Sequence, residues 1–439
     1  MSARLHKAIS GSEAAKVVKS GNRVVLSNFC GEPHLLPDLI MDRSEELRDV
    51  RLLHLRPCGQ FIERYLERGM EKHVRCATAF AGGSRPIIQL LKEGRADFYP
   101  IPLSKVPWLF RSGSFKPDVF IATVTPPDEL GYCSFGVSVD YAHAAAETAA
   151  TVIAEVNENM PRTGGDSLIH ISKIDYLVEA ADSVYEVPTP KVTNLERRLA
   201  ENVAELVEDE ATIQIGYGAV AESIPPFLED KHDLGMHTEM FPESAIDLVD
   251  KGALTNQKKT IDRGKIVSAF CAGSQRLYDW VDGNSSISMK PFDYTNDVET
   301  ISKNNKMTAI NTALQVDLFG NVYSDMLGFD EYSGAGGQPD FVIGASFSPN
   351  GKSIIVIPST TSDGKCSRIV AHPSVSSNPK SPAIPTVARF HADYVVTELG
   401  VASLRGKTLK ERARALFEIS HSDFRTGLEQ EGRRLSLLT

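Results

Sequence analysis

Short runs of apolar and β-branched residues recur along the chain, with longer stretches of mixed polarity between them. The runs stand at residues 23–26, 119–121, 151–153, 212–215, 354–357 and 394–396. A parallel strand that is covered on both faces reads as a continuous apolar run, and helices alternate with such strands along the chain. The pattern therefore predicts an α/β protein with parallel sheets that helices cover on both faces.

A change in the pattern at residues 186–190 indicates a domain boundary. Pro188 and Pro190 remove backbone donors there and favour an extended path. Apolar residues then return at spacings of three and four over residues 195–207, which predicts an amphipathic helix with Asn194 as its N-cap. Because both halves share the α/β pattern, we expect two α/β domains of related build, residues 1–188 and 191–439.

Turn-forming residues at 317–321 separate the segments 309–316 and 322–323, which both read as strands. Such an arrangement predicts a β-hairpin. We therefore expect the sheet of the second domain to be mixed rather than purely parallel.

Composition narrows the class of protein further. The chain has 439 residues, of which 42% are hydrophobic and 24% are charged, and these values exclude wholesale disorder, a collagen-like chain and a coiled coil. The net charge of −10 argues against a protein that binds nucleic acid, although it leaves room for a local basic pocket. The six cysteines stand apart in the sequence, and we find no signal peptide and no membrane-spanning run of about 18 apolar residues. We expect a cytoplasmic protein with reduced thiols.

A glycine-containing turn follows the strand expected at residues 212–215. Gly216 and Gly218 let backbone amides approach a ligand closely, and a helix that begins just beyond them favours phosphate. With Ala221 and the acidic Glu239 the segment also matches a relaxed dinucleotide-binding fingerprint. However, two prolines at 225–226 interrupt the expected crossover helix, and residues 236–239 do not read as an apolar strand that ends in an acid. A phosphate-bearing ligand, a nicotinamide cofactor and a plain tight turn all remain open.

The carboxylate of Glu239 has apolar neighbours on both sides, namely Gly235, Met236, Met240 and Phe241. In a partly apolar cleft, desolvation turns such a carboxylate into a perturbed acid or a stronger nucleophile. The alternative is a solvated glutamate in a surface loop. The histidines at positions 232 and 237 lack the spacing of a zinc-binding helix, so we expect no metal site here.

Three glycines within four residues, Gly334, Gly336 and Gly337, precede a short strand that we expect at residues 342–343. A glycine-rich backbone of this kind can turn several N–H groups toward one point, as an oxyanion hole or an anion site requires. The alternative is a flexible surface loop.

Taken in chain order, these motifs resemble one known family. The segments that carry the resemblance in the second half lie at residues 216–218, 235–240, 294–297 and 333–341, and those in the first half lie at 21–26, 126–132 and 155–161. Together they resemble the acetyl-CoA hydrolase/transferase family, in particular the 4-hydroxybutyrate and butyrate:acetate CoA-transferases. The resemblance covers nearly the whole chain, and the ordered combination is far more specific than any single glycine motif.

The resemblance implies two open α/β domains with the active site between them, and a glutamate that forms a covalent thioester with CoA. Carried onto this sequence, Glu239 is the nucleophile, and Asn296 and the amide of Gly337 are the oxyanion donors. CoA or acyl-CoA enters as a substrate, with no prosthetic group and no metal, and the expected assembly is a homodimer or a higher homo-oligomer. The residues that the resemblance places against CoA are Gly216, Tyr217, Gly218, Ala219, Val220, Leu314, Gly336, Gly337 and Lys365.

The carboxylate that accepts CoA is not specified by these motifs. The family implies acetate, butyrate and 4-hydroxybutyrate, with the dicarboxylates succinate and itaconate as an alternative that requires a second cation. Arg85 and His34 lie in segments of the first half that are candidates for the acceptor pocket, with a structural role as the alternative. An acyl-CoA hydrolase and a non-catalytic binding protein on the same scaffold are the other functions considered.

Overall fold

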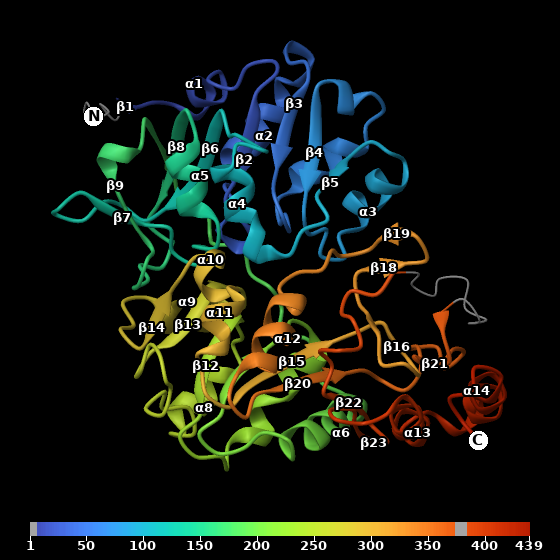
Figure 1. The fold of residues 1–439 in the computed structure, drawn as a ribbon. Coiled ribbons are helices and arrows are strands. Elements are labelled where there is room, and N and C mark those ends of the chain that lie inside the picture. The colour runs from blue at the N-terminus through green and yellow to red at the C-terminus, as the bar shows by residue number, and fades with distance from the viewer. Residues whose placement is uncertain (1–6, 374–383) are drawn as a thin grey trace. The chain divides into compact units, whose positions relative to one another are not determined.

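The computed structural model describes residues 7–373 and 384–439 (Figure 1). By compactness the chain forms two units, which we describe separately. Unit 1 comprises Met1–Pro188 together with Val267–Thr295, and unit 2 comprises Thr189–Ile266 together with Asn296–Thr439. The class is α/β, as the apolar pattern predicted.

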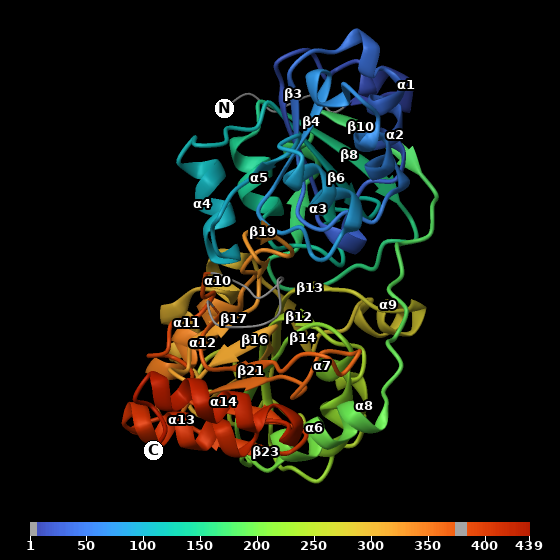
Figure 2. The same ribbon diagram turned by 90° about the vertical axis from the view of Figure 1, so that its right-hand side faces the viewer.

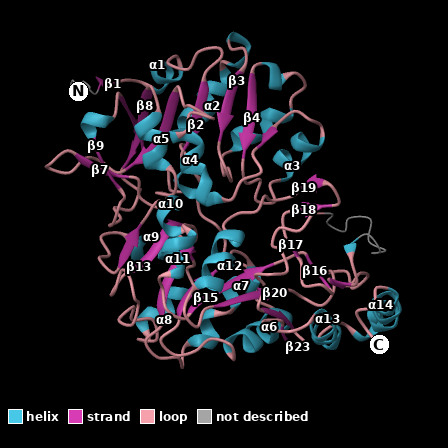
Figure 3. Ribbon diagram, in the orientation of Figure 1, coloured by secondary structure: helices cyan, strands magenta, loops and turns pink. Residues whose placement is uncertain are grey.

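The main sheet of unit 1 is parallel and has the strand order β1-β10-β8-β6-β2-β3-β4-β5. Figure 3 shows these strands in magenta. Their bounds are β1 Lys7–Ala8, β2 Arg23–Leu26, β3 Val50–Leu53, β4 Val74–Thr78, β5 Asp97–Phe98, β6 Val119–Val124, β8 Thr151–Asn157 and β10 Tyr176–Ala180. Every residue of β6 is buried, which is why the sequence shows this strand as an unbroken apolar run.

Helices cover both faces of this sheet, and Figure 2 shows α1 and α2 on one side and α4 and α5 on the other. Along β6, Val119 and Ile121 pack into a cluster with residues of α1 and α2, while Phe120 meets the ring of Phe135 at a tilted angle on the opposite face. The alternation follows from the two-residue period of a strand. The helices are α1 Gly11–Ala15, α2 Leu35–Asp42, α3 Arg85–Lys92, α4 Val106–Arg111 and α5 Ala142–Thr148.

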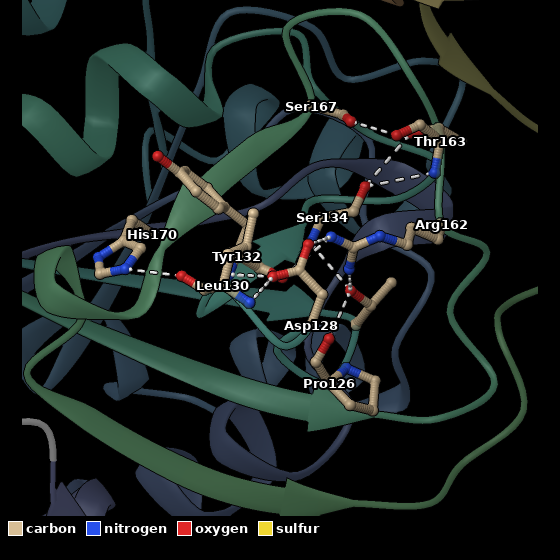
Figure 4. A network of polar contacts seen from close by, with 10 residues as sticks. Pro126, Asp128, Leu130, Tyr132, Ser134, Arg162, Thr163, Ser167 and His170 are labelled. Carbon is tan, nitrogen blue, oxygen red and sulfur yellow. Dashed lines mark hydrogen bonds and ion pairs between the residues drawn. The ribbon is translucent and has the colours of Figure 1, made fainter. Parts of the chain in front are cut away.

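A polar network fixes the loop between β6 and β7 (Tyr132–Ser134), which pairs with β9 (Leu168–His170) (Figure 4). Oδ1 of Asp128 accepts hydrogen bonds from the N–H groups of Leu130 (3.0 Å) and Tyr132 (2.9 Å). Oδ2 accepts a hydrogen bond from Nη2 of Arg162 at 2.5 Å. These hydrogen bonds, that to Tyr132 above all, lower the pKa of Asp128. The segment that resembles the family in this half, residues 126–132, is therefore a tightly bonded turn.

The later segment of unit 1 carries its own short elements. They are β13 Ile266–Cys271, α9 Gln275–Val281, β14 Ile287–Met289 and α10 Phe292–Thr295. The amide of Val139 donates to the carbonyl of Ala269 at 3.1 Å, and Phe29 contacts the ring of Phe270 edge-on, so this segment packs onto the first part of the unit.

The strands of unit 2 follow the order β12-β11-β15-β20-β22-β23, and every pair is parallel except β22 with β23. The antiparallel edge pair makes this sheet mixed. The bounds are β11 Thr212–Ile215, β12 Gly235–Phe241, β15 Met307–Thr312, β20 Lys352–Val356, β22 Tyr394–Thr397 and β23 Gly400–Ser403.

The hairpin expected around residues 317–321 is present, but it lies outside the large sheet. Strands β16 (Gln315–Asp317) and β17 (Val322–Tyr323) pair antiparallel, and β16 also pairs with β21 (Ile369–Val370). The sequence joined 309–316 into one strand, whereas a bend separates β15 from β16. A second hairpin joins β18 (Met326–Leu327) to β19 (Asp330–Glu331).

Helix α6 (Asn194–Ala204) follows the boundary, but its N-cap is Thr193 rather than Asn194. The Thr193 side chain accepts the amide of Leu195 at 3.2 Å, and the Glu196 carboxylate reaches back to the amide of Thr193 at 2.9 Å. This capping box was not predicted, because Thr193 precedes the first apolar position by two residues. The remaining helices of unit 2 are α7 Ala219–Ser223, α8 Ala245–Asp250, α11 Val298–Ser302, α12 Gln338–Phe347, α13 Leu409–Glu418 and α14 Ser422–Arg434.

Helices α11 and α12 pack directly against each other over β15. Phe341 and Ala345 of α12 share a core cluster with Ile301 of α11 and Met307 of β15. Gly344 makes the close approach possible, because a Cβ atom there would lie 2.5 Å from Cγ2 of Ile301.

Candidate active site

Glu239 lies on strand β12, not in a loop as the sequence suggested. The strand is buried along its length, and Glu239 alone among Gly235–Phe241 is half-buried. Polar residues made this segment hard to recognise as a strand from the sequence, but their side chains are buried and have partners. The Thr238 hydroxyl donates to the carbonyl of Ile215 at 3.2 Å, and the ring of His237 packs edge-on against Phe341.

The amide of Asn296 reaches the Glu239 carboxylate. Nδ2 of Asn296 donates to Oε2 of Glu239 at 2.6 Å, and Asn296 is fully buried. The next residue, Asp297, is the N-cap of α11 and accepts the amide of Thr300 at 2.8 Å. The helix cap thus fixes the backbone next to Asn296, and the Asn296 amide is held against the carboxylate.

The backbone of Gly337 lies directly against the Glu239 carboxylate and the Asn296 amide. A Cβ atom on Gly337 would lie 2.0 Å from Oε2 of Glu239 and 2.3 Å from Nδ2 of Asn296, so any side chain at this position displaces these two groups. Positive φ angles at Gly334 (93°) and Gly336 (60°) bend the preceding loop, as the glycine spacing indicated.

The strand expected at residues 342–343 is wrong, because these residues lie in α12, which begins at Gln338. The run Phe341-Val342-Ile343 looked like a strand because the helix is buried on several sides and lacks a polar face. Nε2 of Gln338 donates to the carbonyl of Thr312 at 2.9 Å, which ties the start of α12 to the end of β15.

The turn 216–220 follows β11 and borders the topological switch point of the sheet, where successive connections from β11 run to opposite sides. Strand β11 pairs in parallel with β12 on one side and with β15 on the other, and ligands of open α/β sheets bind at the carboxyl edge of such a switch point. The amide of Gly216 donates to the carbonyl of Ile310 at 2.9 Å, Gly218 has φ 111°, and α7 begins directly after it at Ala219. Tyr217 is 47% exposed at this edge.

Leu314 and Lys365 lie in the loops that follow β15 and β20. Leu314 stands in the bend between β15 and β16, not on a strand. Nη1 of Arg368 donates to the carbonyls of Ala313 and Leu314, each at 3.3 Å, which joins the two loops. Lys365 lies in an exposed turn of the second loop. Arg368 was not identified from the sequence.

A reciprocal pair of buried amides was also missed. Nδ2 of Asn311 donates to Oε1 of Gln214 at 3.0 Å, and Nε2 of Gln214 donates to Oδ1 of Asn311 at 3.3 Å. The pair joins β11 to β15 just before the turn at Gly216. A single polar residue inside each apolar run was the signal that could have identified them.

Lys259 is a buried lysine beneath β12 that was not identified from the sequence. Its Nζ donates to the carbonyls of Met236 (3.0 Å) and Lys265 (2.8 Å), and its stem crosses Gly235, where a Cβ would lie 2.4 Å from its Cγ. Burial lowers the pKa of Lys259 to about 7, against the opposing charge of Asp262.

The two residues considered for the acceptor pocket lie in unit 1. The amide of His34 donates to Oε2 of Glu155 at 2.9 Å at the start of α2, and its ring stacks on Tyr185 with centroids 3.8 Å apart. Burial lowers the pKa of His34. Arg85 is the exposed first residue of α3. The contacts of His34 support a packing role.

Residues 7–373 and 384–439 contain no cluster of three or more His, Cys, Asp or Glu side chains able to hold a metal ion. Within the same ranges, no helix has the length and apolar character needed to cross a membrane.

Comparison with known proteins defines the class. Residues 3–188 match the acetyl-CoA hydrolase/transferase N-terminal domain and residues 273–432 match the acetyl-CoA hydrolase/transferase C-terminal domain. The chain belongs to the acetyl-CoA hydrolase/transferase family.

Individual relatives are similar over nearly their full length. The chain is 42% identical to 4-hydroxybutyrate coenzyme A transferase of Clostridium kluyveri, over 98% of this chain and 97% of the relative. It is 38% identical to succinyl-CoA:cyclohexane-1-carboxylate CoA transferase of Geobacter metallireducens, over 98% and 96%. The crystal structure of 4-hydroxybutyrate CoA-transferase from Porphyromonas gingivalis superposes with a TM-score of 0.83 at 37% identity, over 98% of each chain.

Proposed function

We propose that this protein is a CoA-transferase that moves CoA between an acyl-CoA and a short-chain carboxylate through a thioester on Glu239. The observation that carries the proposal is the contact between Nδ2 of Asn296 and Oε2 of Glu239 at 2.6 Å, beside the backbone of Gly337. A half-buried carboxylate with an amide donor at one oxygen can attack the carbonyl carbon of an acyl-CoA. Once acylated, its own carbonyl group can then be attacked in turn.

The reaction begins when a carboxylate oxygen of Glu239 attacks the carbonyl carbon of the acyl-CoA. The carbon–sulfur bond breaks and CoA departs as the thiolate. An acyl-glutamyl anhydride remains on the enzyme. The thiolate then attacks the glutamyl carbonyl carbon, the anhydride carbon–oxygen bond breaks, and the donor carboxylate departs. A second carboxylate reverses these steps on the glutamyl-CoA thioester, so the cycle needs neither ATP nor a net proton transfer.

Each attack places negative charge on a carbonyl oxygen. When the glutamyl carbonyl is attacked, the oxygen next to Asn296 carries that charge, and the amide is already within hydrogen-bond distance. We assign the N–H of Gly337 as the second donor. Loss of one such donor costs about 10²- to 10³-fold in rate.

We assign CoA to the carboxyl edge of the unit 2 sheet. The turn Gly216, Tyr217, Gly218, Ala219 and Val220 and the bend at Leu314 both border the switch point between β11 and β15. Gly336 and Gly337 follow at the start of α12. Lys365 supplies a positive charge for an anionic part of CoA, which the overall charge of −10 does not provide.

The test of the intermediate is direct. Purified protein is incubated with an acyl-CoA and no acceptor, digested, and searched by mass spectrometry for CoA on the peptide that contains Glu239. The Glu239→Gln variant, which keeps the shape and the hydrogen bond to Asn296, serves as the matched control. A wild-type peptide without an adduct would overturn the proposed mechanism.

We propose 4-hydroxybutyrate, butyrate and acetate as the carboxylates, since two of the relatives above are named for 4-hydroxybutyrate. A matrix of acyl-CoA donors against these acids, with succinate, itaconate and cyclohexane-1-carboxylate added, tests the assignment. Wells without an acceptor measure hydrolysis. Faster turnover with a dicarboxylate, or rapid release of CoA without any acid, would replace this proposal with the corresponding alternative.

We further propose that the protein forms a homodimer or a higher homo-oligomer, that it is cytoplasmic, and that its two domains divide at residues 188–191. Light scattering on the purified protein measures the first, and cell fractionation the second. Separate expression of residues 1–188 and 191–439 tests the third, since a true boundary gives at least one fragment that folds.

A further inference from the structure

Arg368 is held at the carboxyl edge of the unit 2 sheet, between the segments that follow β15 and β20. Its amide donates to the carbonyl of Ser359 at 2.9 Å, and its carbonyl accepts a hydrogen bond from the amide of Val316 at 2.9 Å. Ser359 lies three residues beyond the end of β20, and Val316 belongs to β16, which follows β15. The backbone of Arg368 is therefore fixed from both sides, at the edge where open α/β sheets bind ligands.

In the part of the chain that the structure describes, the guanidinium of Arg368 has only neutral partners. Nη1 donates to the carbonyls of Ala313 and Leu314, each at 3.3 Å, and Nε donates to the carbonyl of Thr360 at 3.1 Å. No carboxylate of the described residues forms an ion pair with Arg368, and Nη2 donates to none of their groups. Charges that are withdrawn from water are normally paired with an opposite charge. The pairing is missing here.

The surroundings of Arg368 therefore favour an anion as ligand. Burial lowers the pKa of Arg368, which means that its positive charge is disfavoured where it lies. The planar guanidinium matches the geometry of phosphate oxygens, and the N–H groups of Nη2 remain for such a ligand. Lys365 differs in this respect, because it lies in an exposed turn where water solvates its charge.

The distance from Glu239 selects the part of CoA that this cation can reach. Strands β11 and β15 lie between β12 and β20, so three strand spacings of about 4.8 Å separate the carboxyl ends of β12 and β20 by about 14 Å. About 13 bonds join the sulfur of CoA to its first phosphorus, and at roughly 1.2 Å per bond in an extended chain they span about 15 Å. A CoA molecule that extends across the sheet from Glu239 thus brings its diphosphate to the loop that carries Arg368.

We propose that Arg368 binds the diphosphate of CoA, an inference that rests on the proposed function because it takes the CoA sulfur to lie at Glu239. Nη2 donates to phosphate oxygens, while Nη1 and Nε keep their hydrogen bonds to the three backbone carbonyls. Binding therefore needs no rearrangement of the two loops. The diphosphate supplies the negative charge that the protein does not place beside this guanidinium.

The test measures the binding of free CoA to the full chain by isothermal titration calorimetry. Arg368→Gln removes the charge, and we expect the Kd of CoA to rise about 10- to 100-fold, because hydrogen bonds to a charged group are lost. Dephospho-CoA, which keeps the diphosphate but lacks the 3′-phosphate, should lose the same factor. Added KCl should weaken CoA binding less in the variant than in wild type, because salt has one charged contact fewer to screen.

Two further variants complete the test. Arg368→Lys restores the charge without the planar fork, so we expect an intermediate Kd, and this milder change also carries the test should Arg368→Gln not fold. Arg425→Gln is the matched control, since the Arg425 guanidinium also donates to backbone carbonyls, those of Ser420 and Glu418, and it should bind CoA as wild type does. An unchanged Kd in Arg368→Gln, a loss that dephospho-CoA does not share, or a loss with the salt dependence of wild type would each overturn the inference.

Failure of the proposed function gives a different result from failure of this inference. Wild-type protein that binds no CoA contradicts CoA transfer itself, and the role of Arg368 fails with it. Equal binding of CoA by wild type and Arg368→Gln, together with a CoA adduct on the Glu239 peptide, overturns the role of Arg368 alone.

Discussion

Asn296 is the residue whose removal isolates one part of the proposed chemistry. Asn296→Ala deletes the donor that lies 2.6 Å from Oε2 of Glu239 and leaves the carboxylate in place. We expect kcat to fall about 10²- to 10³-fold, because one oxyanion donor is lost. Steady-state exchange assays measure the change, with Asn305→Ala, an exposed site nearby, as control. Equal rates for the two variants would remove Asn296 from the mechanism.

Gly337 allows a sharper test, because its substitution affects the site more than the fold. The Cβ of Gly337→Ala displaces the ends of two side chains, Glu239 and Asn296, rather than backbone. A misplacement of about 1 Å costs about 10²-fold in rate, so we expect at least that loss with little change in Tm. Gly427→Ala, where nothing lies within 4 Å, is the matched control. An active Gly337→Ala protein would contradict the assignment.

At the scale of elements, the capping box of α6 makes a measurable contribution to the stability of unit 2. Thr193→Ala removes the side chain that caps the helix, and we expect a loss of about 1 kcal/mol in the free energy of unfolding. Urea denaturation measures it. Thr193→Ser keeps the hydroxyl and should restore most of the loss; a Ser variant as weak as the Ala variant would indicate lost packing instead.

Strands that helices cover on both faces were the most predictable elements, since β2, β6, β8, β11, β20 and β22 all coincide with apolar runs. The strand that carries Glu239 was missed, because Gly235, His237 and Thr238 break its apolar run and only tertiary contacts satisfy them. Helix α12 was mistaken for a strand since its burial on several sides removes the polar face. Glu239, Asn296 and Gly337 could be proposed as a site only through the order of motifs, because no local pattern brings distant residues together.

At the scale of the whole molecule, Lys259 links stability to pH. Its pKa falls from 10.5 to about 7 on folding, so between these values the unfolded chain binds one more proton than the folded chain. Raising the pH through this window therefore stabilises the folded state. The free energy of unfolding of wild type relative to Lys259→Met should increase from pH 7 to pH 10 in urea titrations. A difference that stays constant across this range would contradict a buried lysine with a lowered pKa.

The packing of α11 on α12 has a consequence for how the sequence can vary. Asn296 directly precedes the cap of α11 and Gly337 caps α12, so both proposed donors move with the helix pair that Gly344 and Ile301 hold together. A larger residue at 344 requires a smaller one at 301, and we expect these positions to change together among relatives. Gly344→Ala should slow CoA transfer from a distance, and adding Ile301→Ala should restore part of the rate.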